Sequence, residues 1–192
     1  MTHPDQRENP YVFRTASQIG TDRLVQLFDP DTHGIALEVN DITVDDIASG
    51  LAFQGRYNGQ VQSFISIAEH SVVVATIVRR CDPLNLDLQI AGLFHDAHEA
   101  YLGDTVSPVK AHPLMMHLSA WEEAIDHLIA EVIGVDVALF RHPLVKDADR
   151  VSYFAERDSG RVGRMTPNEA RRAWLNTWQF LRDERNKRKD PT

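Results

Sequence analysis

The sequence predicts a mostly α-helical single domain with a small β-hairpin near its N-terminus. Helical periodicity dominates from about residue 43 onward, no change in composition marks a second domain, and no internal repeat is present. The chain has 192 residues, enough for a sizeable core, and its 43% hydrophobic and 25% charged residues are ordinary for a soluble globular protein. We therefore treat residues 1–192 as one domain.

The N-terminal part differs from the rest. Residues 1–20 are polar and are expected to be flexible, as are residues 187–192 at the other end. Residues 23–40 indicate two short strands around a turn, because apolar residues precede an Asp-Pro-Asp-Thr-His-Gly segment and alternate with small or polar residues after it. A hairpin is expected there.

Helices follow in order along the chain. Thr43, with Asp46 three positions later, is a capping-box-like start for a helix that Gly55 ends. Pro167 behind Thr166 is a favourable start for the last helix. Between these two, a loop with two prolines and a glycine interrupt the pattern. We expect four helices between them, over about residues 66–80, 86–102, 114–133 and 143–160, and the last helix over about residues 167–186.

Charge and cysteine content narrow the possible partners and compartment. A formal net charge of -8 disfavours a general nucleic-acid surface, although a small anionic substrate needs only a local cluster of Arg and Lys. The basic-rich run RDERNKRKD indicates a solvated helix end. The single cysteine, Cys81, excludes an internal disulfide and a CxxC metal site and suits a reducing cytoplasm. No apolar run approaches the roughly 18 residues of a membrane span, and no signal peptide is evident, so a cytoplasmic location without membrane contact is expected.

The segment FHDAHEAYLGD, residues 94–104, places several groups that can bind a metal or move a proton in an otherwise apolar run. On a helix, His95 and Asp96 are about 100° apart and can lean toward one point. His70, on the preceding helix, and Asp149, on a later one, lie among apolar residues, where burial is costly unless the group is paired or bound to a metal. Four such groups on three helices could meet at one point of a bundle.

Two imidazoles and two carboxylates suit a divalent transition metal ion and leave coordination positions for water and a substrate oxygen. Such an ion lowers the pKa of bound water and polarises a phosphoryl oxygen. We therefore expect one ion, Co²⁺, Mn²⁺, Zn²⁺, Fe²⁺ or Ni²⁺. For the last carboxylate, Asp149 is preferred to Asp147, which lies about 200° round the helix and faces solvent.

The ordered set His70, His95-Asp96 and Asp149 resembles the H…HD…D signature of the HD-domain metal-dependent phosphohydrolases. The resemblance covers about residues 41–158, and the segments AEHS, LFHDAHEAYLGDTVSPVK and VKDAD carry it. The chain is most similar to the branch that contains bacterial 5′-deoxynucleotidases and phage-type HD nucleotide phosphohydrolases, including dATP triphosphohydrolases. The resemblance implies an HD-domain helical bundle whose four signature residues hold one divalent ion.

The resemblance also implies roles for residues around the ion. Glu99 matches the carboxylate that acts as general acid or activates water, and Asp104 matches a second acidic residue beside the attacked phosphate. Arg56 and Lys110 match basic groups that grip phosphate. A phosphoryl transition state spreads negative charge over its oxygens and therefore favours such groups around it. Structural roles stay open: an ion pair for Glu99, a turn for Asp104 and solvated charges for the two basic residues.

One position departs from the phage-type pattern R-[FY]-x-G-H, because the chain has Gln60 where a histidine is expected after Arg56. A glutamine can hydrogen-bond but cannot carry a proton or a charge, so a phosphate chain would be handled differently. Tyr57, beside Arg56, is a candidate for contact with the base. Other aromatic residues could stack on a base, but Trp174 and Trp178, four positions apart, are expected to pack the last helix onto the bundle.

Four further histidines are not expected to bind the metal. His98 points away from His95 on a helix and is expected to be a surface histidine or to lie behind the ligands. The spacing of His112, His117 and His127 does not match the two-metal pattern of some HD proteins.

The favoured function is a nucleotide phosphohydrolase that removes phosphate from a deoxynucleoside monophosphate. The alternatives are release of tripolyphosphate from a triphosphate such as dATP, a non-catalytic nucleotide-sensing HD module, and hydrolysis of a cyclic nucleotide or an alarmone such as ppGpp. A small-molecule nucleotide is the expected partner. A homo-oligomer is also expected, since the proteins that this chain resembles often form dimers or larger rings.

Overall fold

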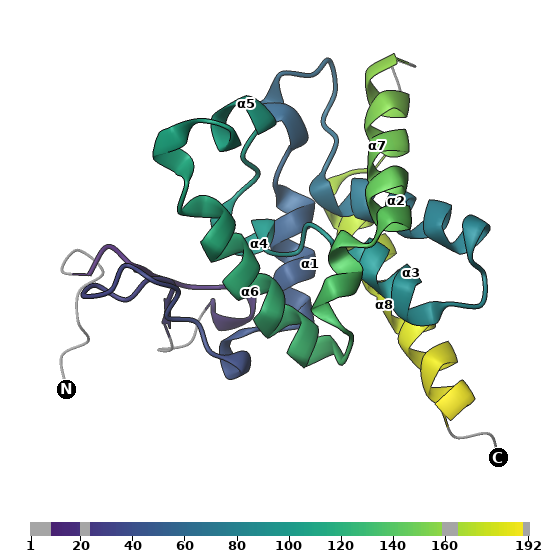
Figure 1. Ribbon diagram of the computed structural model, residues 1–192, viewed down its shortest axis with the longest axis horizontal. Coiled ribbons are helices and arrows are strands. Elements are labelled where there is room, and N and C mark those ends of the chain that lie inside the picture. Colours follow the sequence, from purple (N-terminus) through teal and green to yellow (C-terminus); the bar gives the residue numbers. More distant parts are fainter. Residues whose placement is uncertain (1–8, 20–23, 159–164, 190–192) are drawn as a thin grey trace.

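The chain forms a bundle of helices with a small two-stranded antiparallel sheet on its N-terminal side (Figure 1). The computed structural model describes residues 9–19, 24–158 and 165–189. The predicted mostly α-helical single domain is thus confirmed. Its α-helices are α1 (Val44–Phe53), α2 (Ile67–Cys81), α3 (Leu86–Phe94), α4 (Glu99–Leu102), α5 (Ser107–Lys110), α6 (Leu118–Ile133), α7 (Pro143–Asp158) and α8 (Pro167–Lys189), and its 3₁₀ helices are η1 (Ala16–Gln18), η2 (Val39–Asp41), η3 (Arg56–Gly59), η4 (Pro113–Met115) and η5 (Val137–Arg141).

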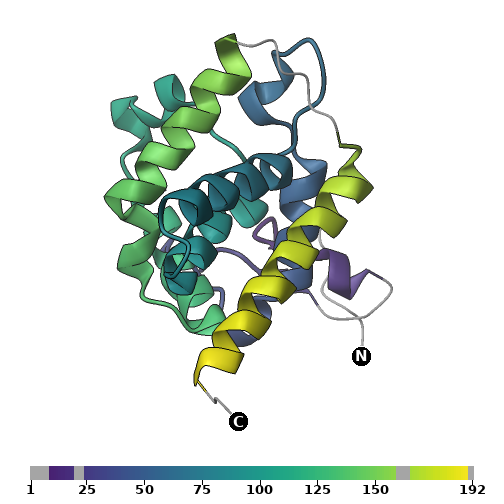
Figure 2. The same cartoon turned by 90° about the vertical axis from the view of Figure 1, so that its right-hand side faces the viewer.

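Every residue of α3 except Asp87 is buried, and α2, α7 and α8 contact this helix. Helix α2 lies between α7 and α8 (Figure 2). The Phe94 ring packs edge-on against Trp174 and Trp178 of α8, with centroids 4.7 and 5.2 Å away. This contact confirms the predicted packing of the two tryptophans onto the bundle. Helix α2 approaches α3 closely at Gly92, where an added Cβ would lie 3.1 Å from a methyl group of Val78.

The predicted helix starts form as expected. The Thr43 hydroxyl accepts a hydrogen bond from the Asp46 N–H at the start of α1. At the start of α8, the Glu169 carboxylate accepts from the Thr166 N–H at 2.8 Å, and Pro167 takes the first helical position. These side chains satisfy N–H groups that have no partner within the helix.

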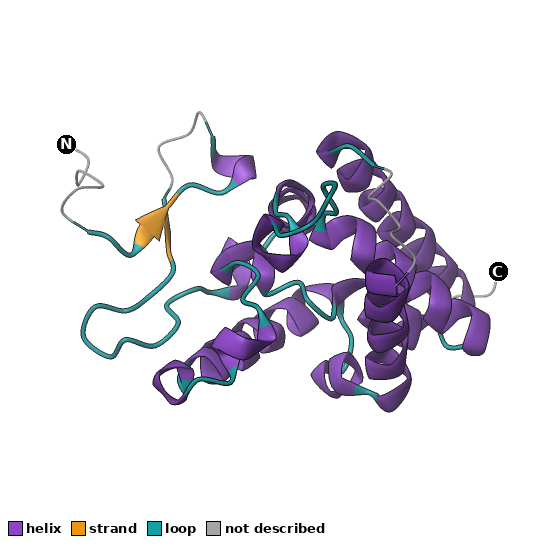
Figure 3. Cartoon of the chain, turned by 90° about the horizontal axis from the view of Figure 1, so that it is seen from above, coloured by secondary structure: helices purple, strands orange, loops and turns teal. Residues whose placement is uncertain are grey.

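The N-terminal sheet differs from the predicted hairpin. Strand β2 (Val25–Gln26) pairs with the earlier β1 (Val12–Phe13), which lies in the segment expected to be flexible (Figure 3). The turn that follows β2 forms only an isolated bridge, between Phe28 and Ile35. The chain then turns inward, and the buried side chain of Leu37 joins the core instead of extending a strand. Residues 1–8 and 190–192 of the segments expected to be flexible lie outside the described residues.

Two other predicted boundaries move. The expected proline loop contains the short helix α5, which carries Lys110. Helix α6 begins at Leu118 rather than near residue 114, because a separate 3₁₀ turn, η4, comes before it. No helix in the described part of the chain is both long and apolar enough to cross a membrane.

Candidate metal centre

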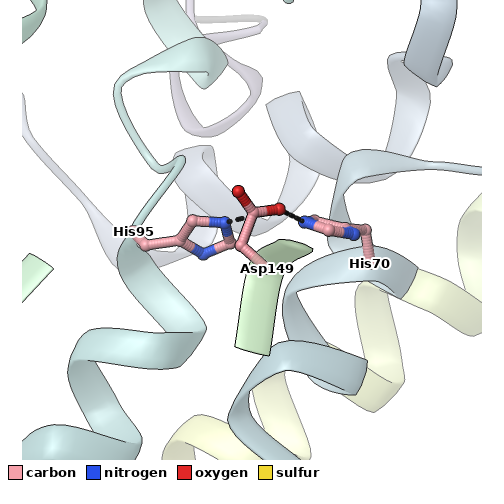
Figure 4. Close-up of side chains that lie close together, drawn as sticks. All are labelled: His70, His95 and Asp149. Atoms are coloured by element: carbon pink, nitrogen blue, oxygen red, sulfur yellow. Dashed lines mark ion pairs between the residues drawn. The ribbon is translucent and has the colours of Figure 1, made fainter. Parts of the chain in front are cut away.

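Three elements bring His70, His95 and Asp149 to one point (Figure 4). His70 lies on α2, His95 follows the last residue of α3, and Asp149 lies on α7. Asp149 Oδ1 is 3.0 Å from His70 Nε2 and 3.9 Å from His95 Nε2. Two atoms that bind the same ion at about 2.1 Å are separated by roughly 3.0 to 4.2 Å. These separations therefore suit atoms that share one ion.

The fourth predicted ligand adjoins this group. Asp96 Oδ2 lies 3.1 Å from His95 Nε2 and 3.9 Å from His70 Nε2. Asp147, the alternative to Asp149, is exposed and pairs with Arg150 at 3.0 Å on the outer face of α7. The helical phase of α7 thus directs Asp149 inward and Asp147 outward.

The chain around His95 is not the continuous helix predicted over residues 86–102. Helix α3 ends at Phe94, and tighter turns follow, in which the N–H groups of Ala97 and Glu99 bond three residues back. His95 Nδ1 donates to the Gly92 carbonyl oxygen at 3.0 Å, so the side chain takes an acceptor of the preceding turn. Such tightening is common at helix ends, and it orients the His95 ring.

The donor atoms of both histidines fit a metal ion. The Gly92 carbonyl can only accept, so His95 carries its proton on Nδ1 and presents the lone pair of Nε2 to the cluster. His70 Nδ1 likewise faces the Glu156 carboxylate at 2.8 Å. Both Nε2 atoms are buried without a hydrogen-bond partner among the described residues. The lone pairs of the two Nε2 atoms therefore face the lone pairs of the Asp149 carboxylate. A cation between these atoms would remove the repulsion and bind to all of them.

The local charges favour ionised carboxylates in the cluster. Burial alone would raise the pKa of Asp96, but the neighbouring His95 holds it well below its usual range. The pKa of Asp149 is also lowered, because contact with His70 and His95 outweighs its burial. Both carboxylates are thus available as ligands at neutral pH.

The surroundings of Glu99 raise its pKa, in contrast to those of Asp96 and Asp149. It is 4% exposed at the start of α4, and Oε2 has no hydrogen-bond partner within the described part of the chain. Burial and the charges of Asp96 and Asp104 raise the pKa of Glu99 to about 9. A carboxyl group that keeps its proton at neutral pH can act as a proton donor.

Lys110 reaches the cluster from α5. Its Nζ lies 3.5 Å from Glu99 Oε1 and 2.9 Å from Glu122 Oε1 on α6. The pKa of Lys110 is raised because its hydrogen bond with Glu122 and the nearby acidic groups outweigh its partial burial. Lys110 is therefore a fixed positive charge beside Glu99 rather than a solvated surface charge.

The turn that carries Arg56 and Tyr57 closes another side of the site. Arg56 is 9% exposed, and its guanidinium lies 3.8 Å from Asp96 Oδ2. The Tyr57 N–H donates to Asp104 Oδ2 at 3.2 Å, which places the second predicted acidic residue beside this turn. Gln60 is exposed at the end of the turn. The predicted basic and acidic groups thus surround the candidate metal ligands, with Gln60 at the exterior.

Of the two positions expected for His98, on the surface or behind the ligands, the surface position is wrong. His98 is 7% exposed, and its Nδ1 lies 2.9 Å from Asp126 Oδ1 on α6. Burial follows because α6 packs over this turn and supplies the carboxylate that offsets the cost. His112, His117 and His127 are exposed and do not join the metal cluster in the described part of the chain.

One residue of the site was missed in the sequence. Glu156 on α7 contacts His70, Arg56 and Tyr57. Burial would raise its pKa, but the hydrogen bond with His70 and the charge of Arg56 lower it to about 2. A signal was present, because Glu156 follows Asp149 by seven positions, which is two helical turns on the same face.

Comparisons with known proteins identify relatives but no function. No protein-family model matches the chain. An uncharacterized protein of Rhodobacter capsulatus is 46% identical over 74 residues, which are 37% of this chain and 38% of the relative. The uncharacterized protein YfdR of Escherichia coli is 32% identical over 118 residues, 62% of this chain and 61% of the relative. The matched region is thus less than two thirds of the length of either relative.

Proposed function

We propose that the chain is an HD-domain metal-dependent phosphohydrolase that removes phosphate from deoxynucleoside monophosphates. The observation that carries this proposal is the pair of buried Nε2 atoms, of His70 and His95, that converge with Asp149 and lack hydrogen-bond partners among the described residues. Asp96 lies beside them, and Glu99 follows one turn later. The order of these residues along the chain supports the HD family.

The ligands of the ion would be His70, His95, Asp96 and Asp149. Imidazole and carboxylate together favour Mn²⁺, Fe²⁺, Co²⁺, Ni²⁺ or Zn²⁺. When bound, such an ion supplies a water of lowered pKa and polarises the phosphoryl oxygen.

The surrounding residues would handle the proton and the phosphate charge. Glu99, which burial keeps protonated at neutral pH, would give its proton to the leaving oxygen. Arg56 lies beside Asp96 and Lys110 beside Glu99, and both would offset the negative charge of the phosphoryl group. Asp104, which accepts from the Tyr57 N–H, would hold the Arg56 turn beside the phosphate.

A nucleotide panel tests the proposal. Metal-stripped protein would be loaded with each of the five ions and given deoxynucleoside mono- and triphosphates, and ³¹P NMR would identify the product. We expect orthophosphate from monophosphates. Asp149→Ala and Glu99→Gln should lower turnover by at least about 100-fold, whereas Asp147→Ala, two residues away on the exposed face of α7, should not.

Other results would point elsewhere. Tripolyphosphate released from a triphosphate would replace the monophosphatase with the alternative activity. Metal binding without turnover of any nucleotide would instead favour a sensing module.

A further inference from the structure

Glu156 receives four polar contacts, two on each carboxylate oxygen. Oε1 lies 2.8 Å from His70 Nδ1 and accepts from Ser152 Oγ at 3.0 Å. Oε2 accepts from Arg56 Nε at 3.0 Å and from the Tyr57 hydroxyl. A carboxylate has about four acceptor sites, so all of them are used. The side chain is 12% exposed, which leaves little room for water to replace a partner.

The contact on Oε1 determines how His70 meets the cluster. An ionised carboxylate only accepts, and the guanidinium of Arg56 keeps Glu156 ionised. His70 must therefore carry a proton on Nδ1, which leaves the Nε2 lone pair toward Asp149. Carboxylates behind metal-bound histidines commonly fix the ring in this way.

The contacts on Oε2 hold a strained turn. Tyr57 and Asn58 have φ values of 60° and 52°, in the left-handed region that non-glycine residues rarely adopt. Such a backbone conformation is unfavourable for a residue with a Cβ and persists only where surrounding contacts impose it. The Tyr57 hydroxyl and Arg56 Nε bind the same Glu156 oxygen, so one acceptor fixes both side chains of this turn.

We propose that Glu156 is a positioning residue that couples the metal ligand His70 to the turn carrying Arg56 and Tyr57. One oxygen sets the ring of the ligand, and the other holds the groups that face the phosphate. Movement of this carboxylate would therefore disturb both sides of the site at once. The inference rests on the metal centre of the proposed function, but it concerns metal affinity and ring tautomer rather than hydrolysis.

Two variants distinguish the effect of the Glu156 charge from the effect of its side-chain length. Glu156→Gln keeps the shape but presents an NH₂ group on one side, so it cannot accept from both His70 and Arg56. Glu156→Asp keeps a charge for Arg56, which favours folding, but it withdraws the carboxylate by one methylene. We expect both variants to weaken Zn²⁺ binding by about 10- to 100-fold in calorimetry. Asp147→Asn on the same helix is the matched control and should bind Zn²⁺ like the parent.

A second readout detects the ring itself. In ¹⁵N-histidine NMR at pH 8 without metal, the parent should show His70 protonated on Nδ1, and both variants should shift it toward the Nε2–H tautomer. His95 is an internal control, because its partner is the Gly92 carbonyl and not Glu156. Unchanged Zn²⁺ affinity together with an unchanged His70 tautomer in Glu156→Asp would overturn the inference. Normal metal and tautomer behaviour of the parent without nucleotide turnover would overturn only the proposed function.

Discussion

His95 Nδ1 donates to the carbonyl oxygen of Gly92, three residues earlier, at 3.0 Å. The residue that sets the orientation of this candidate ligand is thus the same glycine at which α3 packs closely against α2. An added Cβ at Gly92 would lie 3.1 Å from Val78 Cγ2 and 3.3 Å from the Ala75 backbone. A change in the spacing between α2 and α3 would therefore move the Gly92 carbonyl group and, with it, the His95 ring.

Gly92→Ala is expected to destabilise the fold by about 1 to 3 kcal/mol, because the new methyl group forces α3 away from α2. The same shift should weaken metal binding by moving His95 relative to His70. Urea unfolding measures the first effect and calorimetry with Zn²⁺ the second. Ser119→Ala, at an exposed position of α6, is the control. A Gly92→Ala protein with parental stability would contradict the close packing.

Asp149→Ala is expected to reduce divalent metal affinity by at least about 100-fold, since it removes a ligand rather than a supporting group. A ligand that binds only the folded state raises the melting temperature, so saturating metal should stabilise the parent more than this variant. Differential scanning fluorimetry with each of the five ions measures this difference. Asp147→Ala should retain the full metal-dependent rise, and equal rises in both variants would argue against the cluster as a metal site.

Glu99→Gln is expected to stabilise the metal-free protein at alkaline pH. The unfolded chain loses the Glu99 proton near the ordinary pKa of 4.5, whereas the folded chain keeps it to about 9. The favourable contribution of this group is therefore complete below about pH 4.5 and is lost as the pH rises toward 9. The glutamine stays neutral, so at pH 8 we expect its free energy of unfolding to exceed that of the parent by several kcal/mol.

Chemical unfolding at pH 5 and pH 8 measures this difference. The advantage of Glu99→Gln should be larger at pH 8. Glu123→Gln, with a side chain 57% exposed on α6, should show no such change. A pH-independent difference would mean that Glu99 is ionised in the fold and is not the proton donor.

Lys110→Ala is expected to lower stability by about 1 kcal/mol, because it leaves the Glu122 carboxylate without its cation and removes the contact with the Glu99 carboxyl group. It should also lower turnover of a nucleotide, since a positive charge beside the phosphate is lost. Lys146→Ala, on the exposed face of α7, is the control for the change in net charge. Parental stability and turnover in Lys110→Ala would assign Lys110 to the solvated surface.

The sequence determined the helical class, the helix starts and the grouping of the candidate ligands. Thr43 and Thr166 act through residues three positions away, and such contacts depend only on local helical geometry. The choice of Asp149 over Asp147 follows from the same periodicity, because one helical phase sends the two carboxylates to opposite faces. Residue spacing along one helix was sufficient to predict these features.

The tertiary structure alone decided the pairing of groups from distant segments. Glu156 meets His70 across 86 positions and Arg56 across 100, and no local pattern specifies such partners. The burial of His98 likewise depends on Asp126 of α6, which packs over the turn after His95. Periodicity fixes which way a side chain points from its own helix. Only the packing of several helices decides which groups that side chain contacts. At this site those contacts set the ring orientations and proton positions on which the proposed metal binding depends.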